Sequence, residues 1–370
     1  MSDIENQYLT NQITRLSKPK LPPNELYIFF HFDLVDSTRL KNELVQNNEW
    51  VIVIKKFYSA MQHEIETEYP NIKRWKLLGD AISFYLHANA FDSIDDICSI
   101  FQKSFQAQKR TCNLVTYENN FKKQVQIHIK TTLFCADTKF LDYENITYEN
   151  INSSKDVSQH FYNLGFIDEE NPIDLPGNGN KSTIRVDFLG PDIDIGFRLA
   201  SKANKRSVTV SAELAFIISS LGMKNIANPI SKSLRIVNYE KLKGVWNDRA
   251  YPIIWYHPDW NNIKENFDYD EHVDNESIKN IFLNAEQEVN EKLSNIMEKQ
   301  FLLEKLNEII KKMRTDFKSK TKIVDITYMK ETLAPSEETI KNPANESRIM
   351  SHEKFLSLIA EFDTKTKKKN

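Results

Sequence analysis

A run of apolar residues that ends at an acid constrains the fold of this chain more than any other stretch. Residues 27–32, Tyr-Ile-Phe-Phe-His-Phe, are almost continuously apolar, which predicts a strand buried on both faces. The run stops at Asp33, and residues 36–38, Asp-Ser-Thr, are types that begin helices. Carboxylate oxygens bind hard cations, and free N–H groups at a helix start bind phosphates. An acid after a buried strand also occurs in ordinary loops, so this stretch alone does not define a site.

A second stretch, at residues 75–86, predicts a β-hairpin with its turn at Gly79 and Asp80. If this hairpin pairs beside the first strand, Asp33 and Asp80 face each other. Two carboxylates that lie close together repel each other strongly unless a cation lies between them. Because Trp75 alternates with Lys76 along the strand, we expect the Trp75 ring to point away from Lys76 and into the core.

These two stretches resemble motifs of the class III nucleotidyl cyclases. In that family, Phe-x-Asp is followed by Ser or Thr at a helix start, which is similar to the segment that holds Asp33, Ser37 and Thr38. A Lys-x-x-Gly-Asp sequence comes later, and here it begins at Lys76 and ends at Asp80.

Two further segments follow in the order that the family has. Its third motif, Asp-x-x-Gly-x-x-x-Asn-x-x-x-Arg, is similar to the segment with Asp187, Gly190 and Arg198. Asp194 stands where the family has the Asn. The fourth segment, Leu-Lys-Gly-Val around Lys243 with a second strand after it, looks like the family's closing hairpin and its phosphate-binding lysine. Four motifs in this order are far more specific than any one of them.

The resemblance covers residues 25–258 and implies an α/β (α+β) fold, a ferredoxin-like sandwich with helices on a mostly antiparallel sheet. Apolar spacing agrees, because it predicts a helix over residues 38–69 with a break near Asn47 and Asn48, a helix over residues 90–108 and a strand over residues 124–135. The polar, turn-rich residues 137–181 are expected to form a surface insertion with a short helix near residues 157–164.

The rest of the chain divides by composition. We expect an N-terminal segment at residues 1–24, a helical extension at residues 259–317 and a charged, partly ordered tail at residues 318–370. The apolar stripe of the extension begins near residue 275. This stripe fits a helix packed on the catalytic domain, and it also fits a surface for a dimer or another partner.

Composition bears on partners and location. The chain has 370 residues, 27% of them charged, and a net charge of −3, so no bulk attraction to nucleic acid or anionic lipid is expected. Cys98, Cys112 and Cys135 lack metal-ligand spacing and are expected to be buried thiols in a reducing compartment. The sequence shows no signal peptide and no stretch of the ~18 apolar residues that a membrane span needs. We therefore expect a cytoplasmic protein without stable membrane insertion.

The chemistry of cyclisation indicates what the acids would do. The ribose 3′-oxygen attacks the α-phosphorus and pyrophosphate leaves, a reaction suited to two divalent cations per site. Asp33 and Asp80 are the candidate ligands that bridge these ions, and the resemblance implies a carbonyl ligand from Leu34. Oxygen donors of this kind favour Mg²⁺ or Mn²⁺.

The charge on the phosphates requires fixed cations and N–H donors. Arg198 and Lys243 are the candidate cations, because they would stabilise negative charge that develops during the reaction. Amide groups of Val35, Ser37 and Thr38 are expected to hold the β- and γ-phosphates. Asp194 cannot donate a hydrogen bond as the family's Asn does. It either holds the ribose differently or pairs with Arg198 at the i, i+4 spacing.

The base-reading pair of the family corresponds to Lys76 and Asp187. Lysine only donates hydrogen bonds and aspartate only accepts them. An amino group beside a ring-nitrogen acceptor satisfies this pair, and adenine and cytosine present that pattern. Guanine and uracil present the reverse pattern. The pair therefore favours ATP or CTP over GTP or UTP.

Purine or pyrimidine preference follows from resemblance alone. The motifs look most like those of the stand-alone cyclases of Pycsar anti-phage systems, which make cyclic CMP or cyclic UMP. In those systems the cyclic nucleotide acts on a separate effector protein. Together with the hydrogen-bonding pattern of Lys76 and Asp187, the resemblance implies a cytidylate cyclase that uses CTP, with a uridylate cyclase that uses UTP as the alternative.

Other classes of function remain open. An adenylate cyclase that makes cyclic AMP is one, and a catalytically dead binding module is another, although the presence of both acids and Arg198 argues against it. The Gly-Gly-acid-acid-Phe signature of diguanylate cyclases is absent. Family members form their site between two catalytic domains, and this chain has one motif set. The resemblance therefore implies a head-to-tail homodimer with two equivalent sites.

Overall fold

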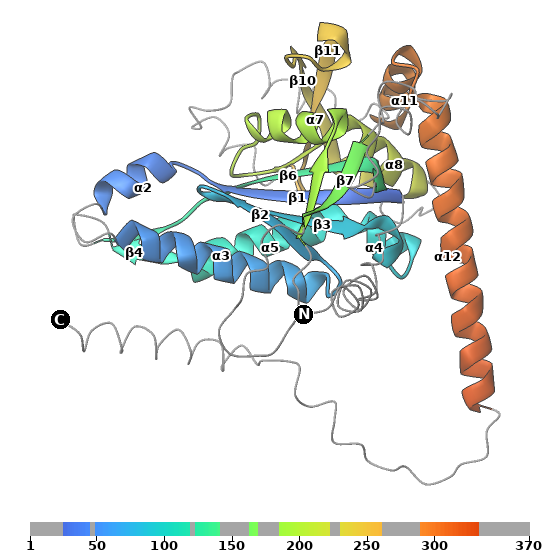
Figure 1. Cartoon of the computed structure of the whole chain (residues 1–370), viewed down its shortest axis with the longest axis horizontal. Coiled ribbons are helices and arrows are strands. Elements are labelled where there is room, and N and C mark those ends of the chain that lie inside the picture. The colour runs from blue at the N-terminus through green and yellow to red at the C-terminus, as the bar shows by residue number, and fades with distance from the viewer. Residues whose placement is uncertain are drawn as a thin grey trace, which may run out of the picture. The chain divides into compact units, whose positions relative to one another are not determined.

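The computed structural model describes residues 25–44, 49–118, 123–140, 163–168, 185–222, 230–260 and 289–332 (Figure 1). Contacts divide the chain into two units, residues 1–321 and residues 322–370. In the second unit the described residues are 322–332, which form the last part of helix α12 (Leu303–Thr332). The sheet, the helices that cover it and the candidate site all belong to the first unit.

A nine-stranded sheet forms the centre of the first unit. Its strands are β1 (Glu25–Leu34), β2 (Lys73–Leu78), β3 (Ala81–His87), β6 (Ile129–Phe140), β7 (Asn163–Asp168), β8 (Arg185–Leu189), β9 (Val208–Val210), β10 (Leu234–Lys241) and β11 (Ala250–Tyr256). The main order is β10-β11-β9-β6-β1-β3-β2, with β7 pairing to β6 and β8 pairing to β7. All pairs are antiparallel except β6 with β7 and β6 with β9. This architecture confirms the predicted α/β class with a mostly antiparallel sheet.

Strand β1 lies at the centre of the sheet, between β3 and β6. Side chains alternate across a strand, so β1 contributes to two different apolar clusters. Leu26, Ile28, Phe30, Phe32 and Leu34 face the main core, and Tyr27 and Phe29 face a smaller cluster on the opposite side. The prediction of a first strand buried on both faces is confirmed, and its C-terminal end carries Asp33.

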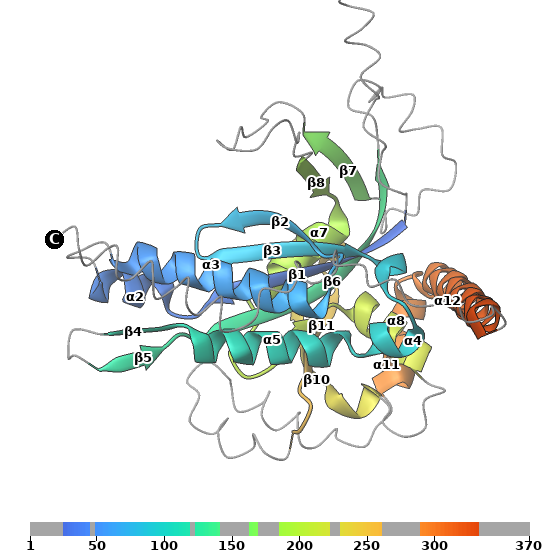
Figure 2. The same ribbon diagram turned by 90° about the horizontal axis from the view of Figure 1, so that it is seen from below.

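Helices cover the main core face. Helices α3 (Glu49–Glu68) and α5 (Ile100–Leu114) run side by side there, as Figure 2 shows. The short helices α2 (Ser37–Glu43) and α4 (Ile94–Cys98) precede them, and α8 (Ala212–Gly222) packs near α4 and β11. The helix predicted over residues 38–69 is therefore two helices, with residues 45–48 outside the described part. The helix predicted over residues 90–108 corresponds to α4 and α5.

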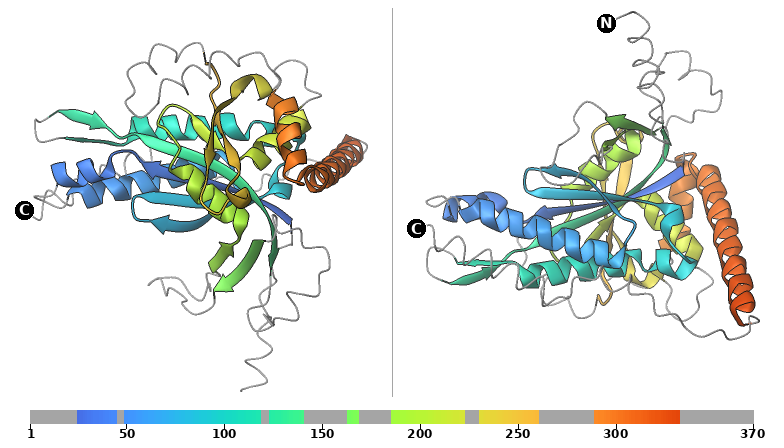
Figure 3. Two further views of the ribbon diagram at one scale, coloured as in Figure 1. Left: turned by 90° about the horizontal axis from the view of Figure 1, so that it is seen from above. Right: turned by 60° about the horizontal axis from the view of Figure 1, so that its bottom comes forward.

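The opposite face carries helix α7 (Pro191–Ala200) and the β7–β8 hairpin (Figure 3). Phe134 and Phe188 form the centre of an aromatic cluster there, with Trp75 and Phe197 at its edge. A Cβ atom on Gly196 would lie 2.5 Å from the Phe134 ring, so α7 can approach the sheet this closely only with glycine at that position.

Strand β7 differs from the prediction for residues 137–181, which were expected to form an irregular excursion. Strand β6 continues to Phe140, and residues 163–168 add a strand parallel to it. Residues 141–162 and 169–184 lie outside the described part, as does most of the helix predicted near residues 157–164; its last two residues begin β7. The insertion therefore contributes a strand that holds β8, and with it Asp187, in the sheet.

The C-terminal extension packs on the domain through helix α11 (Val289–Lys299) and helix α12. Leu306, Ile310, Met313 and Phe317 of α12 are buried in the main core. Lys312 pairs with Glu25 at 3.0 Å and Lys305 with Asp137 at 2.8 Å. These contacts show that the extension packs on the domain that contains the sheet. Residues 261–288, where the predicted stripe begins, lie outside the described part.

Two observations concern cysteines and membranes. Cys112 and Cys135 are buried free thiols and Cys98 is a half-buried one. Burial raises the pKa of Cys112 to about 11 and of Cys98 to about 12.

Across the described ranges, every helix is too short or too polar to cross a bilayer.

Candidate functional site

The two predicted acids meet where β1 ends beside the β2–β3 turn. Asp33 is the cross-strand partner of Ala81, and the Leu34 N–H donates to the Asp80 carbonyl at 3.2 Å. The turn is held from the other side by Tyr58, whose hydroxyl donates to the Gly79 carbonyl. The backbone therefore brings Asp33 and Asp80 together although they lie far apart in the sequence. As expected for neighbouring acids, the charge of Asp80 contributes to raising the pKa of Asp33.

A lysine that the sequence did not single out completes this group. Lys130 on β6 is the cross-strand partner of Asp33, and its Nζ lies 3.2 Å from Oδ2 of Asp33. Burial raises the pKa of the Asp33 carboxyl, the Lys130 ammonium opposes that rise, and the charge of Asp80 adds to it. In the sequence, Lys130 is one polar position among the alternating residues of a strand, and nothing there shows which residue of β1 it faces.

His31 lies two residues before Asp33, on the same face of β1. Its Nδ1 is 2.8 Å from Oγ of Ser83 on β3. Burial and, to a smaller extent, the charge of Lys130 lower the pKa of His31 to about 4, and the charge of Asp80 opposes this shift. The imidazole is therefore neutral near physiological pH, so it adds no charge beside the acids.

The loop after Asp33 partly matches the predicted phosphate-binding amides. The Val35 N–H donates to the His128 carbonyl at 2.9 Å, so this amide is already engaged. Asp36 adopts a left-handed conformation, with φ of 56°, and α2 begins at Ser37. The predicted contacts of Ser37 and Thr38 therefore involve the first turn of α2, and the Val35 amide would be free only after the loop rearranges.

The predicted base-reading pair forms a direct ion pair. Lys76 Nζ lies 2.8 Å from Oδ1 of Asp187. The same oxygen accepts hydrogen bonds from Nε1 of Trp75 and from the Phe188 N–H, each at 2.8 Å. Burial raises the pKa of Asp187, but the hydrogen bonds from Lys76, Phe188 and Trp75 outweigh it, and the pKa lies below its usual value. Since Oδ1 carries three donors, Oδ2 is the acceptor best placed to receive a further one.

The prediction that Trp75 points away from Lys76 is wrong. The register of β2 against β3 shifts between Arg74 and Lys76, which is a bulge at Trp75. An extra residue breaks the alternation, so Trp75 and Lys76 both reach Asp187. Lys76 Nζ also lies 4.2 Å from the centre of the Trp75 ring. The ring itself packs in the aromatic cluster, as expected, but its N–H belongs to the base-reading group.

Helix α7 presents Asp194 and Arg198 one turn apart. Asp194 is exposed, and within the described residues no hydrogen bond or ion pair joins it to Arg198. Nε of Arg198 is buried and has no hydrogen-bond partner among the described residues. The start of α7 is fixed by Asp192, whose carboxylate accepts from Asn163 at 2.6 Å. An arginine with an unsatisfied buried N–H has capacity for an acceptor such as a phosphate oxygen.

Lys243 lies in the turn between β10 and β11, where its side chain is exposed. Val245 N–H donates to the Leu242 carbonyl at 3.0 Å, and Gly244 has φ of 73°, as the third position of such a turn requires. Within the described part of the chain, neither Lys243 nor Arg198 makes a hydrogen bond or ion pair with Asp33, Asp80 or Asp187. The structure therefore groups the acids with Lys130 and groups Lys76 with Asp187, and it leaves the two predicted phosphate-binding cations outside both groups.

The acid group fits a divalent cation in its donor chemistry. Described residues contain no cluster of three or more His, Cys, Asp or Glu side chains arranged for a metal. Two carboxylates with a backbone carbonyl and solvent suit Mg²⁺ or Mn²⁺, which keep several waters and need few protein ligands. A positive charge already lies against Asp33 in the form of the Lys130 ammonium.

Among known proteins, similarity to this chain is found in the backbones of solved structures. No family model matches the chain, and no curated protein matches it. The adenylyl cyclase CyaB from P. aeruginosa aligns with 13% identity over 64% of this chain and 95% of its own, with a TM-score of 0.38. The guanylate cyclase domain of RhGC from Catenaria anguillulae, in complex with GTP, aligns with 10% identity over 63% of this chain and 97% of its own, with a TM-score of 0.36. The guanylyl cyclase Cya2 aligns with 12% identity over 64% of this chain and 95% of its own, with a TM-score of 0.36. Similarity at this level establishes neither family nor activity.

Proposed function

We propose that this chain is a nucleotidyl cyclase that converts CTP to 3′,5′-cyclic CMP and pyrophosphate. One observation carries the proposal, the meeting of Asp33 and Asp80 at the end of the central strand. Two acids at one sheet end, together with a lysine and a base-sized donor and acceptor pair on the neighbouring strands, form the set of groups that this reaction needs.

The acids would hold two Mg²⁺ or Mn²⁺ ions, with the Leu34 carbonyl as a further ligand. When bound, such ions supply a more acidic 3′-hydroxyl and a better-stabilised pyrophosphate. The carboxylates of Asp33 and Asp80 orient the reacting end of the nucleotide through that site. Neutral His31 beneath them adds no positive charge that would compete for the same position.

Cations of the chain would neutralise the triphosphate from several sides. Lys130 stands beside Asp33 and can turn its ammonium from the carboxylate to a phosphate oxygen. Arg198 offers a buried Nε that has no partner within the described residues, and Lys243 offers an exposed ammonium. Fixed positive groups at developing negative charge stabilise a transition state more than a ground state. Asp194, exposed one turn before Arg198, would accept a hydrogen bond from the ribose.

The base would be read by Lys76 and Asp187. Lys76 donates and Oδ2 of Asp187 accepts, a combination that matches the N3 and amino group of cytosine. Trp75 supports this reading because its N–H occupies Oδ1 and holds the carboxylate in place. The choice of cytosine over adenine rests on the resemblance to Pycsar cyclases, and UTP is the alternative substrate. In that setting the cyclic nucleotide would signal phage infection to a separate effector protein.

The active form would be a head-to-tail homodimer. Arg198 and Lys243 contact neither acid within the described chain, so a second copy would bring them to the acids of its partner. Exposed apolar residues on the edges that carry the base-reading pair support an interface there. Leu77 is 47% exposed on β2, and Leu189 is 57% exposed on β8.

The test incubates the purified protein with ATP, CTP, GTP and UTP separately, with Mn²⁺, and identifies products by mass spectrometry. Cyclic CMP as the main product supports the proposal, with Asp33→Asn as the inactive control. Cyclic AMP alone would overturn the pyrimidine assignment. Absence of every cyclic product from a dimeric, folded sample would overturn the cyclase assignment itself.

A further inference from the structure

The turn that carries Lys243 is anchored in the core from its other side. Leu242 and Val245, which flank the exposed Lys243 and Gly244, are 5% and 4% exposed. Trp246 follows and is 4% exposed. The exposed ammonium is therefore attached to a short segment whose neighbours are all buried, which limits how far the turn can move.

The backbone after the turn is strained. Trp246 and Asn247 have φ angles of 48° and 55°, so two consecutive residues without glycine adopt the left-handed conformation. This conformation is unfavourable for a bulky residue such as tryptophan, and it persists only where surrounding contacts impose it. The buried indole of Trp246 is a part of this segment on which such contacts can act.

Tyr251 supplies such a contact, and Glu213 holds Tyr251 in place. The rings of Trp246 and Tyr251 lie 4.4 Å apart, and Tyr251 is fully buried. The Tyr251 hydroxyl donates to Oε2 of Glu213 at 2.7 Å and accepts from the Ala212 N–H at 2.8 Å. A chain of contacts thus joins the first turn of α8 to Trp246, three residues beyond Lys243.

Burial of the Glu213 carboxyl in this position has a free-energy cost. It is 2% exposed, and its Oε1 has no hydrogen-bond partner in the described part of the chain. Burial raises the pKa of Glu213, and hydrogen bonds from Tyr251, from its own backbone N–H and from Ser211 oppose the rise. A buried carboxyl destabilises a fold unless its hydrogen bonds or another role compensate.

We propose that Tyr251 and Glu213 are positioning residues for Lys243. This inference rests on the proposed function. Tyr251 and Glu213 fix the position of Trp246, and Trp246 fixes the turn. The Lys243 ammonium then meets the triphosphate at one defined position. Preorganised cations stabilise developing charge without moving during the reaction. A lysine on an exposed turn can act in this way only if the backbone of the turn is held rigidly. Neither residue touches the nucleotide.

The decisive test is a double-mutant cycle on the dimeric, full-length protein with the nucleotide that it turns over best. Tyr251→Phe keeps the ring but removes the hydroxyl, and we expect kcat to fall about tenfold with KM nearly unchanged. In a Lys243→Ala background the same change should alter kcat less than about twofold, because the residue that it positions is gone. Tyr256→Phe, also buried on β11, is the matched control and should leave kcat unchanged. Equal losses in both backgrounds would overturn the inference.

A second readout is independent of activity. Hydrogen exchange of the amides in residues 242–247 should become faster in Tyr251→Phe, while exchange in β9 and the paired part of β11 stays as in the wild type. Unchanged exchange in the turn would also overturn the inference. If the wild-type dimer makes no cyclic nucleotide, the proposed function fails and the catalytic role of Tyr251 falls with it. Faster exchange would then show only that Tyr251 fixes the turn.

Discussion

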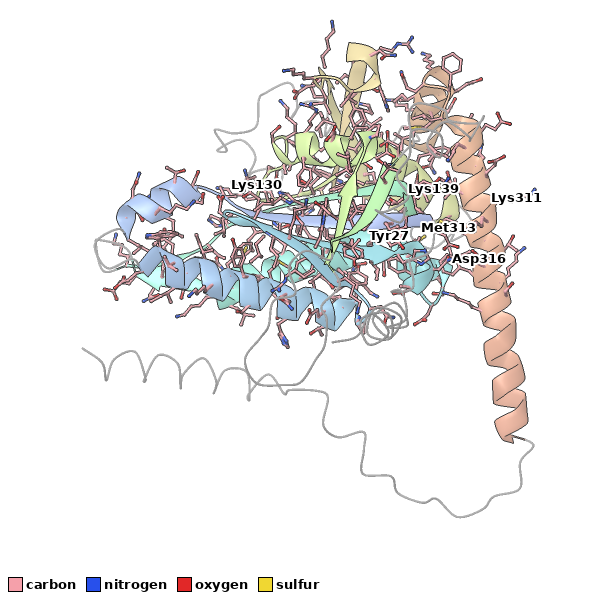
Figure 4. All side chains as sticks on the ribbon, viewed as in Figure 1. Tyr27, Lys130, Lys139, Lys311, Met313 and Asp316 are labelled. Carbon is pink, nitrogen blue, oxygen red and sulfur yellow. The ribbon has the colours of Figure 1, made fainter. Side chains whose placement is uncertain are left out.

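Lys130 Nζ lies 3.2 Å from Oδ2 of Asp33 across the pairing of β1 with β6. Lys130 belongs to the end of β6 beside the acids, and Lys139 lies toward the far end of the same strand (Figure 4). The charge of this ammonium opposes the rise in the pKa of Asp33 that burial and the charge of Asp80 cause. It also stands where the proposed divalent cation would bind, so lysine and metal would compete for one carboxylate.

This competition predicts the effect of Lys130→Met on metal binding. Removing the ammonium should raise the affinity for Mn²⁺ in the absence of nucleotide by about fivefold, because the ion pair is half-exposed and contributes about 1 kcal/mol. Isothermal titration calorimetry measures this directly. Lys139→Met, an exposed lysine of the same strand, should leave the affinity unchanged. Weaker Mn²⁺ binding by Lys130→Met would show that the lysine supports the metal site instead of competing with it.

Substitution of Asp187 should relax base selection. Asp187→Asn presents an amide that can donate as well as accept, so it tolerates the reversed pattern of uracil. We expect the ratio of UTP to CTP turnover to rise about tenfold, measured as kcat/KM for each nucleotide. Trp75→Phe retains the ring packing and removes only the N–H donor to Asp187, so a smaller shift in the same direction is expected. A ratio unaffected by Asp187→Asn would exclude this pair from base recognition.

Shared sites predict complementation between two inactive variants. Asp33→Ala lacks a metal ligand and Arg198→Ala lacks a phosphate-binding cation, so each homodimer should be inactive. After equal mixing through unfolding and refolding, half of the dimers are mixed and each has one intact site, which gives about a quarter of the wild-type activity. Size-exclusion chromatography and mass spectrometry establish that mixed dimers have formed. Inactive mixed dimers would place all the required residues within one subunit.

A buried histidine away from the acids predicts a pH dependence of stability. Burial lowers the pKa of His257 to about 4, while the N–H of Asp259 donates to its Nδ1 at 3.0 Å. Unfolded histidine has a pKa of about 6.5, so between these values the unfolded chain binds a proton that the folded chain does not. The contribution of His257 is therefore fully present above about pH 6.5 and is lost as the pH falls toward 4.

Urea unfolding near neutral pH and at about pH 5 tests this dependence, because His257→Asn removes the titrating group. Between the two conditions, the wild type should lose about 2 kcal/mol more of its free energy of unfolding than the variant does. Identical losses for wild type and His257→Asn would contradict the prediction.

The features that sequence predicted well are short in range. The apolar run before Asp33 and the turn at Gly79 and Asp80 are local patterns, and pairing their two strands side by side is enough to bring the acids together. Amphipathic spacing likewise predicted the helices that cover the main core. The fold class followed because these elements leave few ways to bury their apolar faces.

What the sequence did not show depends on register between distant strands. Lys130 became part of the site because β6 pairs with β1 at one particular offset. Trp75 turned toward Asp187 because of a bulge whose position is set by pairing with β3. Strand β7 lies among polar residues, and only its neighbours β6 and β8 make it a strand. Local propensity contains none of this information.

Gly196 has a mechanical consequence for the position of Arg198. Helix α7 rests so closely on Phe134 that it cannot slide along the sheet or lift from it without emptying a filled aromatic layer. Arg198 therefore moves with the sheet as one rigid part. In the proposed homodimer, opening and closing around a nucleotide would occur by rotation of one whole subunit against the other, and the speed of that rotation would limit how fast product leaves.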